Sequence, residues 1–342
     1  MTSPLFGMLG DRRARPPLIA LGVALWSVAT ALAGFARGFA SLFSARSAVG
    51  VGEAAYGTIA PALLADSFAF EKRGRVLAVF FAAIPVGSAA GYVLGGLVDQ
   101  HFGWRAAFWI AGAPGLLLSV LVLLVHDPPR GAHDHGAAGS EAAGAGTYLR
   151  LLRNRPYLLT VLGYAAYTFA LGGLAFWMPA FLERARGMTR SEATVTFGAI
   201  ALVTGFAGTF AGGWLGDFFL RWTERSYLWV SGVVTLVAAP VTWVALTDPR
   251  RAHYLPAIVI AEVLIFMSTG PVNSAIINAV APSERATALG LSVFVMHLLG
   301  DIPSPPLIGT LSDATSLERA FLIVPVAIVI AGMIWVWAAW RK

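Results

Sequence analysis

Long charge-free stretches recur along the chain and limit what it can fold into. Each is about 20 residues or more, the length that an α-helix needs to cross a hydrocarbon core of roughly 30 Å. They lie between residues 15 and 37, 75 and 99, 105 and 127, 155 and 183, 192 and 217, 225 and 248, and 319 and 341. Three more spans hold isolated charges: 39–67, 254–281 and 286–311. The pattern predicts an all-α membrane protein with ten full transmembrane helices and a short apolar start at residues 4–9.

The composition and the distribution of charge agree with a multi-pass membrane protein. The chain is 57% hydrophobic and 12% charged, whereas a soluble domain carries about 25% charged residues. Its net charge of +6 does not indicate nucleic acid, because the basic residues lie near the ends of the apolar spans. Lys and Arg are more numerous on the side that holds Arg12, Lys72 and Arg150, so we expect that side to be cytoplasmic.

A segment rich in Pro, Gly, Ala and Ser interrupts the spans at residues 127–150. It predicts a flexible cytoplasmic linker between an N-terminal bundle, 1–126, and a C-terminal six-helix bundle, 151–342. The two sides repeat each other: "GMLGD" ends at Asp11 and "GWLGD" at Asp217, while "LGGLVD" ends at Asp99 and "IGTLSD" at Asp313. Two parallel repeats of membrane helices resemble the layout of major facilitator transporters. The sequence therefore predicts a major facilitator fold of two pseudo-symmetric bundles.

Two charges interrupt the apolar stretch "ARSAVGVGEAAYG": Arg46 and Glu53. A charge at mid-bilayer costs about 2.5 to 3.5 kcal/mol, and such residues usually line a water-filled path. Their seven-residue spacing puts them on one helix face, and we expect them to be buried there. Arg46 would bind an anionic head group. Burial raises the pKa of a carboxyl and a nearby guanidinium lowers it, so Glu53 would be able to bind and release a proton. The alternative is a static ion pair that stabilises the helix.

Other ionisable groups lie in the later spans. His297 and Asp301, in "HLLGDIPSPP", are neighbours on one helix face and form a candidate proton-sensitive pair. Pro303 follows them, and with the next prolines it should kink or break this helix. The alternative is a hydrogen-bonded core pair that stabilises the kink. Glu262 is a lone carboxyl with a candidate role in proton coupling; otherwise it snorkels toward the membrane surface or bonds to a hydroxyl of a neighbouring helix.

The loop "GMLGDRRARP" carries Asp11, Arg12 and Arg15 at the expected cytoplasmic mouth. Asp11 is a candidate gating residue, since it can accept hydrogen bonds from a neighbouring bundle in one state and lose them in another. The arginines would take part in that gate or would only fix the topology.

Several functions are disfavoured by what the sequence lacks. There is no cysteine, and neither Lys72 nor Lys342 lies in a phosphate-binding Gly-Lys-Ser/Thr loop. No H-E-x-x-H or G-x-S-x-G motif occurs, and no nucleophile constellation accompanies the intramembrane charges. We therefore expect no enzyme, no metal and no cofactor, and transport that runs on ion gradients.

The quoted motifs resemble one family. "RSAVGVGEAAYGTIAPALLADSF", "RVLAVFFAAIPVGSAAGYVLGG", "FWMPAFL" and "HLLGDIPSPPLIGTLSD" are similar to the spinster-like branch of the major facilitator superfamily. The resemblance implies a twelve-helix fold and export of amphipathic lipids such as sphingosine phosphates and lysophospholipids. It places Arg46 and Glu53 in the cavity of the fourth helix, and His297 and Asp301 in the eleventh. Tyr56 joins them as a candidate substrate-binding residue.

By this resemblance we expect the family's first transmembrane helix to be missing from this chain, with residue 1 lying within the second. The main hypothesis is a proton-coupled secondary transporter of amphipathic anionic lipids that works by alternating access. It would be a monomer in a bacterial inner membrane, with protons and a lipid-like small molecule as its partners. The alternatives are a multidrug or metabolite exporter of the same superfamily, a transport-inactive truncated membrane protein that acts as a scaffold or receptor, and, last, a membrane enzyme.

Overall fold

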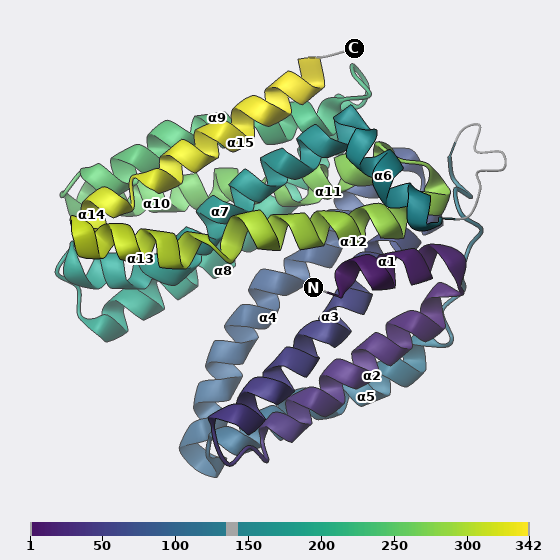
Figure 1. Cartoon of the computed structure of the whole chain (residues 1–342). Coiled ribbons are helices and arrows are strands. Elements are labelled where there is room, and N and C mark those ends of the chain that lie inside the picture. Colours follow the sequence, from purple (N-terminus) through teal and green to yellow (C-terminus); the bar gives the residue numbers. More distant parts are fainter. Residues whose placement is uncertain (1, 135–142, 341–342) are drawn as a thin grey trace. The chain divides into compact units, whose positions relative to one another are not determined.

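The computed structural model describes residues 2–134 and 143–340, and within these residues it consists of helices without strands (Figure 1). The all-α fold predicted from the apolar spans is confirmed. Among the described residues, nine helices are long and apolar enough to cross a membrane. The 30-residue helix α4, Arg73–Phe102, is not one of the nine, so the expected count of ten complete spans is not confirmed.

The chain divides into two compact units that do not follow the order of the sequence. Unit 1 comprises Met1–Phe70, Gly87–Leu151 and Val280–Phe294, and unit 2 comprises Glu71–Val86, Leu152–Ala279 and Val295–Lys342. Each unit thus contains a short segment from the sequence half that mainly builds the other. These units are not the two predicted bundles, so the division of the chain at 127–150 stays a prediction.

Unit 1 is organised around α2, which packs against α3 and α5 (Figure 1). Helices α2 and α3 approach closely at two glycines: a Cβ on Gly52 would lie 2.8 Å from Cβ of Trp26, and one on Gly22 would lie 2.7 Å from Cβ of Ala55. Small residues permit such contacts between membrane helices. The helices that lie wholly or mainly in this unit are α1 (Ser3–Arg12), α2 (Arg15–Ala33), α3 (Phe39–Ser67), α5 (Trp104–Val122), α6 (Ala145–Arg153), η2 (Pro282–Glu284) and α12 (Arg285–Met296).

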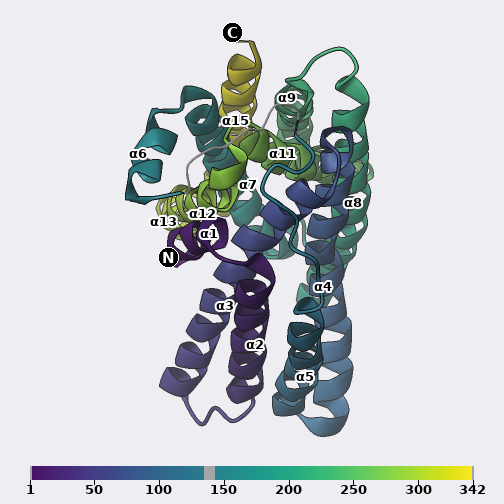
Figure 2. The same ribbon diagram turned by 90° about the vertical axis from the view of Figure 1, so that its right-hand side faces the viewer.

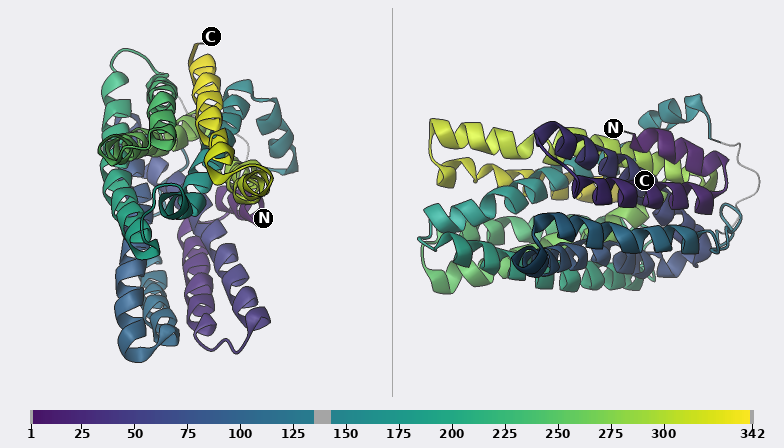
Figure 3. Two further views of the ribbon diagram at one scale, coloured as in Figure 1. Left: turned by 90° about the vertical axis from the view of Figure 1, so that its left-hand side faces the viewer. Right: turned by 90° about the horizontal axis from the view of Figure 1, so that it is seen from below.

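Unit 2 is organised around α15, which packs against α7 and α9 and is drawn in yellow (Figure 3). Trp335 of α15 is fully buried, and its indole Nε1 donates to the carbonyl oxygen of Thr160 at 3.0 Å. Helix α4 is divided between the two units, with residues 73–86 in unit 2 and 87–102 in unit 1. The remaining elements of the chain are η1 (Phe70–Lys72), α7 (Arg155–Arg184), α8 (Arg190–Phe219), α9 (Ser226–Thr247), α10 (Arg251–Phe266), α11 (Thr269–Asn278), η3 (His297–Asp301), α13 (Ser304–Ala314), α14 (Leu317–Ala320) and α15 (Ile323–Trp340).

The segment expected to be a flexible linker, 127–150, has defined structure at both ends. Residues 127–134 are fixed by hydrogen bonds and ion pairs within unit 1, and the last part of the segment belongs to α6. Residues 135–142 lie outside the described part of the chain. Composition alone did not indicate this order, because carbonyl, amide and charged groups, rather than apolar side chains, hold the first part in place.

Candidate functional site

Helix α3 carries the two charges that the sequence singled out. Arg46 and Glu53 are both exposed, so the expectation that they are buried is wrong. Gly50 and Gly57 lie on the same side of the helix, and a Cβ on either would meet no atom within 4 Å. The side of α3 that carries Gly52 packs instead on α2. No described part of the chain therefore packs against the charged face at these two glycines.

Tyr56 lies beside this open face and is half-buried. Its ring meets that of Trp26 on α2 edge to face, with 5.2 Å between the ring centroids. Such an arrangement fixes the ring while leaving one side of it accessible. The face thus offers a cation, a carboxylate and an aromatic wall within three helical turns.

Asp11 links the two sequence halves inside unit 1. Its carboxylate accepts hydrogen bonds from the backbone N–H of Ala286 (3.0 Å) and of Thr287 (2.7 Å), and from Oγ1 of Thr287 (2.6 Å). These donors form the first turn of α12, where unsatisfied N–H groups favour a negative charge. Figures 1 and 2 show α1 beside α12, and Gly7 makes the approach possible, because a Cβ there would collide with the backbone of α12.

Asp217 makes the matching contact inside unit 2. Its carboxylate accepts from the backbone N–H of Gly74 (2.9 Å) and of Arg75 (3.1 Å), at the start of α4, and from the hydroxyl of Tyr227 at 2.9 Å. The Arg75 side chain adds an ion pair at 2.9 Å. The aspartate of each repeat therefore binds the start of a helix that comes from the other repeat.

A buried group of charges lies next to the Asp11 contact in unit 1. Asp66 has no exposed surface, and its two carboxylate oxygens bind two guanidinium groups. Arg15 approaches at 2.6 Å, and Arg285 forms a second, short ion pair. Each arginine is itself almost fully buried, with 1% and 2% of its surface exposed. Arg15 is thus part of an ion-pair network in addition to any effect on topology.

The segment 127–134 covers this group and supplies further partners to it. Its backbone carbonyls and carboxylates accept hydrogen bonds from the arginines, and a backbone N–H donates to Asp66. Buried polar groups need such partners. The contacts are Asp127 with Arg15 Nε (2.7 Å), Pro128 O with Arg15 Nη2 (2.6 Å), Gly131 N with Asp66 Oδ1 (3.0 Å), Asp134 with Arg285 (2.7 Å), and Arg130 with the carbonyls of Gly10 (3.0 Å) and Arg13 (2.6 Å). Arg12 donates to the carbonyl oxygen of Ala143.

The Asp11 contact should depend on pH. Burial raises the pKa of Asp11 to about 6, against the opposing effect of the hydrogen bonds from Thr287 and Ala286. The buried carboxyl binds a proton more tightly than a solvated one with a pKa near 3.8, so the contact is favoured at low pH. It should weaken as the pH rises from about 4 to about 6, by about 2 to 3 kcal/mol in all, and stay constant above that.

Hydrogen exchange at the amides of residues 286 and 287 measures this effect. After correction for intrinsic exchange rates, we expect protection at pH 4.5 to exceed protection at pH 7. In the variant Asp11→Asn, which cannot titrate there, protection should not change over this range. Protection that rises with pH in the native chain would contradict the prediction.

His297 and Asp301 form a pair in unit 2, as the sequence predicted. Nδ1 of His297 lies 2.9 Å from each carboxylate oxygen of Asp301, and both side chains are partly exposed. Five residues from His297 to Asp301 form a π-turn that separates α12 from α13. Thr168 of α7 donates to the carbonyl of Met296 at 3.1 Å and so supports the turn. The expected break of this helix before the prolines is present, and π-turns are frequent at functional sites.

Glu262 of α10 is the most deeply buried carboxyl among the candidate residues. Only 3% of its surface is exposed, and its Oε1 has no hydrogen-bond partner among the described residues. A buried carboxyl oxygen without a hydrogen bond is costly in such surroundings. The alternative of a bond from this oxygen to a neighbouring hydroxyl is not seen among the described residues.

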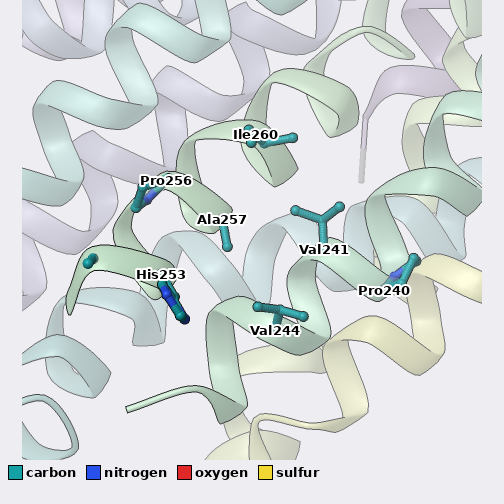
Figure 4. Close-up of a pocket in the computed structure, with 8 residues that line it drawn as sticks. Pro240, Val241, Val244, His253, Pro256, Ala257 and Ile260 are labelled. Carbon is teal, nitrogen blue, oxygen red and sulfur yellow. The ribbon is translucent and has the colours of Figure 1, made fainter. Parts of the chain in front are cut away.

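A shallow cavity of about 400 Å³ lies between α9 and α10 in unit 2 (Figure 4). Its walls are apolar side chains from both helices, with His253 at one end. Nδ1 of this histidine lies 2.9 Å from a carboxylate oxygen of Asp248, which is half-buried at the helix connection. No group of three or more potential metal ligands occurs among residues 2–134 and 143–340. This cavity therefore offers an apolar surface and no constellation for chemistry.

Sequence reasoning missed Asp66, Asp217, Arg285 and Thr287 as site residues. Three of them could have been found from the sequence, because the repeat that pairs Asp11 with Asp217 also aligns "EKRGRVLAVF" with "SERATALGLSVF", which contains Arg285 and Thr287. These two stretches supply the helix starts that the two aspartates bind. Asp66 carried no such signal, because a single acidic residue at the end of an apolar span is compatible with exposure.

Comparisons with known proteins agree with this arrangement. The model of the Major Facilitator Superfamily matches residues 1–302. The zebrafish protein spinster homolog 3 is 37% identical over 334 residues, which cover 92% of this chain and 67% of that protein. The Drosophila melanogaster protein spinster is 32% identical over 91% of this chain and 53% of its own length. Human protein spinster homolog 1 is 36% identical, over 91% and 63%. This chain therefore spans between about half and two thirds of these relatives.

Solved structures share the fold. A crystal structure of a bacterial homologue of the human lysosomal transporter spinster, in an inward-facing and unoccupied conformation, covers 99% of this chain and 86% of its own, with a TM-score of 0.66 and 22% identity. The Escherichia coli fucose:proton symporter covers 99% and 87%, with a TM-score of 0.79 and 18% identity. At these identities the likeness concerns the fold.

Proposed function

Because the chain belongs to the spinster branch of the Major Facilitator Superfamily, a family of transporters rather than enzymes, we propose that it is a proton-coupled secondary transporter of amphipathic anionic lipids. The substrate would resemble a lysophospholipid or a sphingosine phosphate, and transport would proceed by alternating access. The observation that carries the proposal is the open face of α3, where Arg46 and Glu53 are exposed and Gly50 lies between them on the same face.

An open charged face in a membrane helix needs water or a polar ligand. A lipid-facing charge would be costly, so we propose that this face borders the substrate path. The Arg46 guanidinium would bind a phosphate head group through two parallel hydrogen bonds. Glu53 would take up and release the coupled proton, and Tyr56 would contact the adjoining part of the substrate.

The two aspartate contacts support alternating access. Asp11 and Asp217 each bind the first turn of a helix from the other repeat, so breaking both contacts would remove hydrogen bonds that link the two repeats. We propose that both contacts belong to the cytoplasmic side of the membrane, together with the linker and the C-terminus, because Lys and Arg are more numerous there. The chain would act as a monomer in a bacterial inner membrane.

His297, Asp301 and Glu262 are proposed as further members of the proton pathway. The first two form a hydrogen-bonded pair at a π-turn, and the third is a buried carboxyl whose Oε1 has no hydrogen-bond partner among the described residues. Ionisable groups within membrane spans often belong to proton relays.

Uptake into proteoliposomes with an imposed pH gradient tests the proposal. A lipid extract is offered, and accumulated species are identified by mass spectrometry. We expect amphipathic anions to accumulate with the native chain, and Glu53→Gln to lower gradient-driven accumulation at least about tenfold, since the proton carrier is lost. The matched control is Glu183→Gln, an exposed carboxyl at the end of α7. Undiminished gradient-driven uptake by Glu53→Gln would show that the proton role is wrong.

A further inference from the structure

A second cavity, of about 360 Å³, lies within unit 2 where four helices begin or end. It is formed by the first residues of α7, the residues around the start of α9, and the last residues of α11 and α15. Its volume is at the lower end of the range for small-molecule sites. None of the residues proposed above for the substrate path lines it.

One part of the cavity is suited to an anion. Arg155 is the first residue of α7 and Arg225 directly precedes α9, so two guanidinium groups and the starts of two long helices meet at the same cavity. Helix starts and guanidinium groups both favour phosphate oxygens. Nη1 of Arg225 donates to the carbonyl of Ala339 at 3.2 Å, which holds this guanidinium at the end of α15. Asn278 also lines this cavity.

Another part of the cavity is suited to a cation and to apolar groups. Glu224 is exposed and lines the same space as the two arginines. Beyond these charges, Leu159 and Leu228 contribute apolar wall. The rings of Trp229 and Trp340 meet nearby at the ends of α9 and α15, with centroids 6.4 Å apart, as expected for the interfacial level of a membrane.

We propose that this cavity binds a head group that joins a phosphate ester to a primary ammonium group, as a phosphoethanolamine lipid does. The phosphate lies against Arg155 and Arg225, the ammonium against Glu224, and the first methylene groups of the lipid against the leucines. A purely anionic head group would leave Glu224 unpartnered beside it, and like charges there disfavour binding. This is a site for a resident lipid, separate from the face of α3, and it does not rest on the transport function proposed above.

Native mass spectrometry of the purified full chain in detergent tests the site. The probes are phosphatidylethanolamine and phosphatidylglycerol with identical acyl chains, and free phosphoethanolamine serves as a competitor. We expect one phosphatidylethanolamine to be retained about tenfold more tightly than phosphatidylglycerol. Arg155→Gln and Arg225→Gln should each weaken binding of both lipids about tenfold, because each removes one charge-assisted contact. Glu224→Gln should weaken only phosphatidylethanolamine and so abolish the preference.

Control variants separate this site from general electrostatics and from the substrate path. Arg153→Gln removes an equally exposed charge at the same end of the molecule but outside the cavity, and it should bind both lipids as the native chain does. Arg46→Gln should also retain the lipid, whether or not it transports.

Several results would overturn the assignment. These are native-like retention of both lipids by Arg155→Gln and Arg225→Gln, or an unchanged preference in Glu224→Gln. Arg155 is exposed, so its variant stays informative if Arg225→Gln fails to fold. If free phosphoethanolamine displaces the lipid at equal concentration, the site holds a soluble ester of the same chemistry; if it does not, the acyl part contributes and the occupant is a lipid.

Discussion

Replacing Asp66 by asparagine should destabilise unit 1 by about 3 kcal/mol or more, because the change leaves two buried guanidinium groups without their shared carboxylate. Asparagine keeps the shape of the side chain and removes its charge. Arg15 and Arg285 retain Asp127 and Asp134 as partners, but neither of these carboxylates replaces the oxygens that lie between the two arginines. The midpoint of thermal unfolding in detergent should fall by on the order of 10 °C.

The matched control for this substitution is Asp313→Asn. Asp313 is an exposed aspartate near the end of α13, and its replacement should change the stability by less than about 0.5 kcal/mol. Equal unfolding midpoints for Asp66→Asn and Asp313→Asn would show that the buried cluster adds nothing to stability. A loss confined to Asp66→Asn would confirm that the cluster, and with it the segment 127–134, holds unit 1 together.

Replacing Arg46 by glutamine should lower the uptake of anionic amphiphiles at least about tenfold, with a smaller effect on uncharged analogues of the same chain length. A charge-assisted hydrogen bond contributes about 1.5 to 3 kcal/mol, and glutamine keeps one amide donor while it loses the charge. The loss should appear mainly as a higher substrate concentration for half-maximal uptake. The measurement compares anionic and uncharged substrates in the same proteoliposomes.

Arg37→Gln provides the control for the charge change. Arg37 is exposed in the connection between α2 and α3, and its replacement removes the same charge from the same unit. It should leave the ratio of anionic to uncharged uptake unaltered. If Arg46→Gln also left that ratio unaltered, the guanidinium would have no part in recognising the head group, whatever the total uptake.

The fold was largely predictable because apolar length is a strong signal. A span such as 226–247 has no alternative to a membrane helix, and the repeat of "GMLGD" in "GWLGD" indicated two related halves. The exposure of individual charged side chains was less predictable than the fold. Arg46 and Glu53 were expected to be buried because their neighbours are apolar, but no described residue packs against this face at Gly50 and Gly57.

The contacts over long sequence distances could not be predicted from the sequence, for a different reason. Asp66 meets Arg285 across more than 200 positions, and no local pattern connects a single aspartate to a single arginine so far away. His297 and Asp301 were predictable because helix geometry alone sets their separation. The π-turn between them was not, since the prolines indicate only that the helix is interrupted.

The reciprocal aspartate contacts bear on how the chain acquires its structure. A protein cut between residues 134 and 143 would yield two fragments, each with an acceptor whose donors reside on the other fragment. Asp11 would be severed from residues 286 and 287, and Asp217 from residues 74 and 75. Neither of the two repeats therefore contains both partners of these contacts. We expect the contacts to form only after both repeats have been synthesised, and co-expressed fragments to form them only by associating with each other.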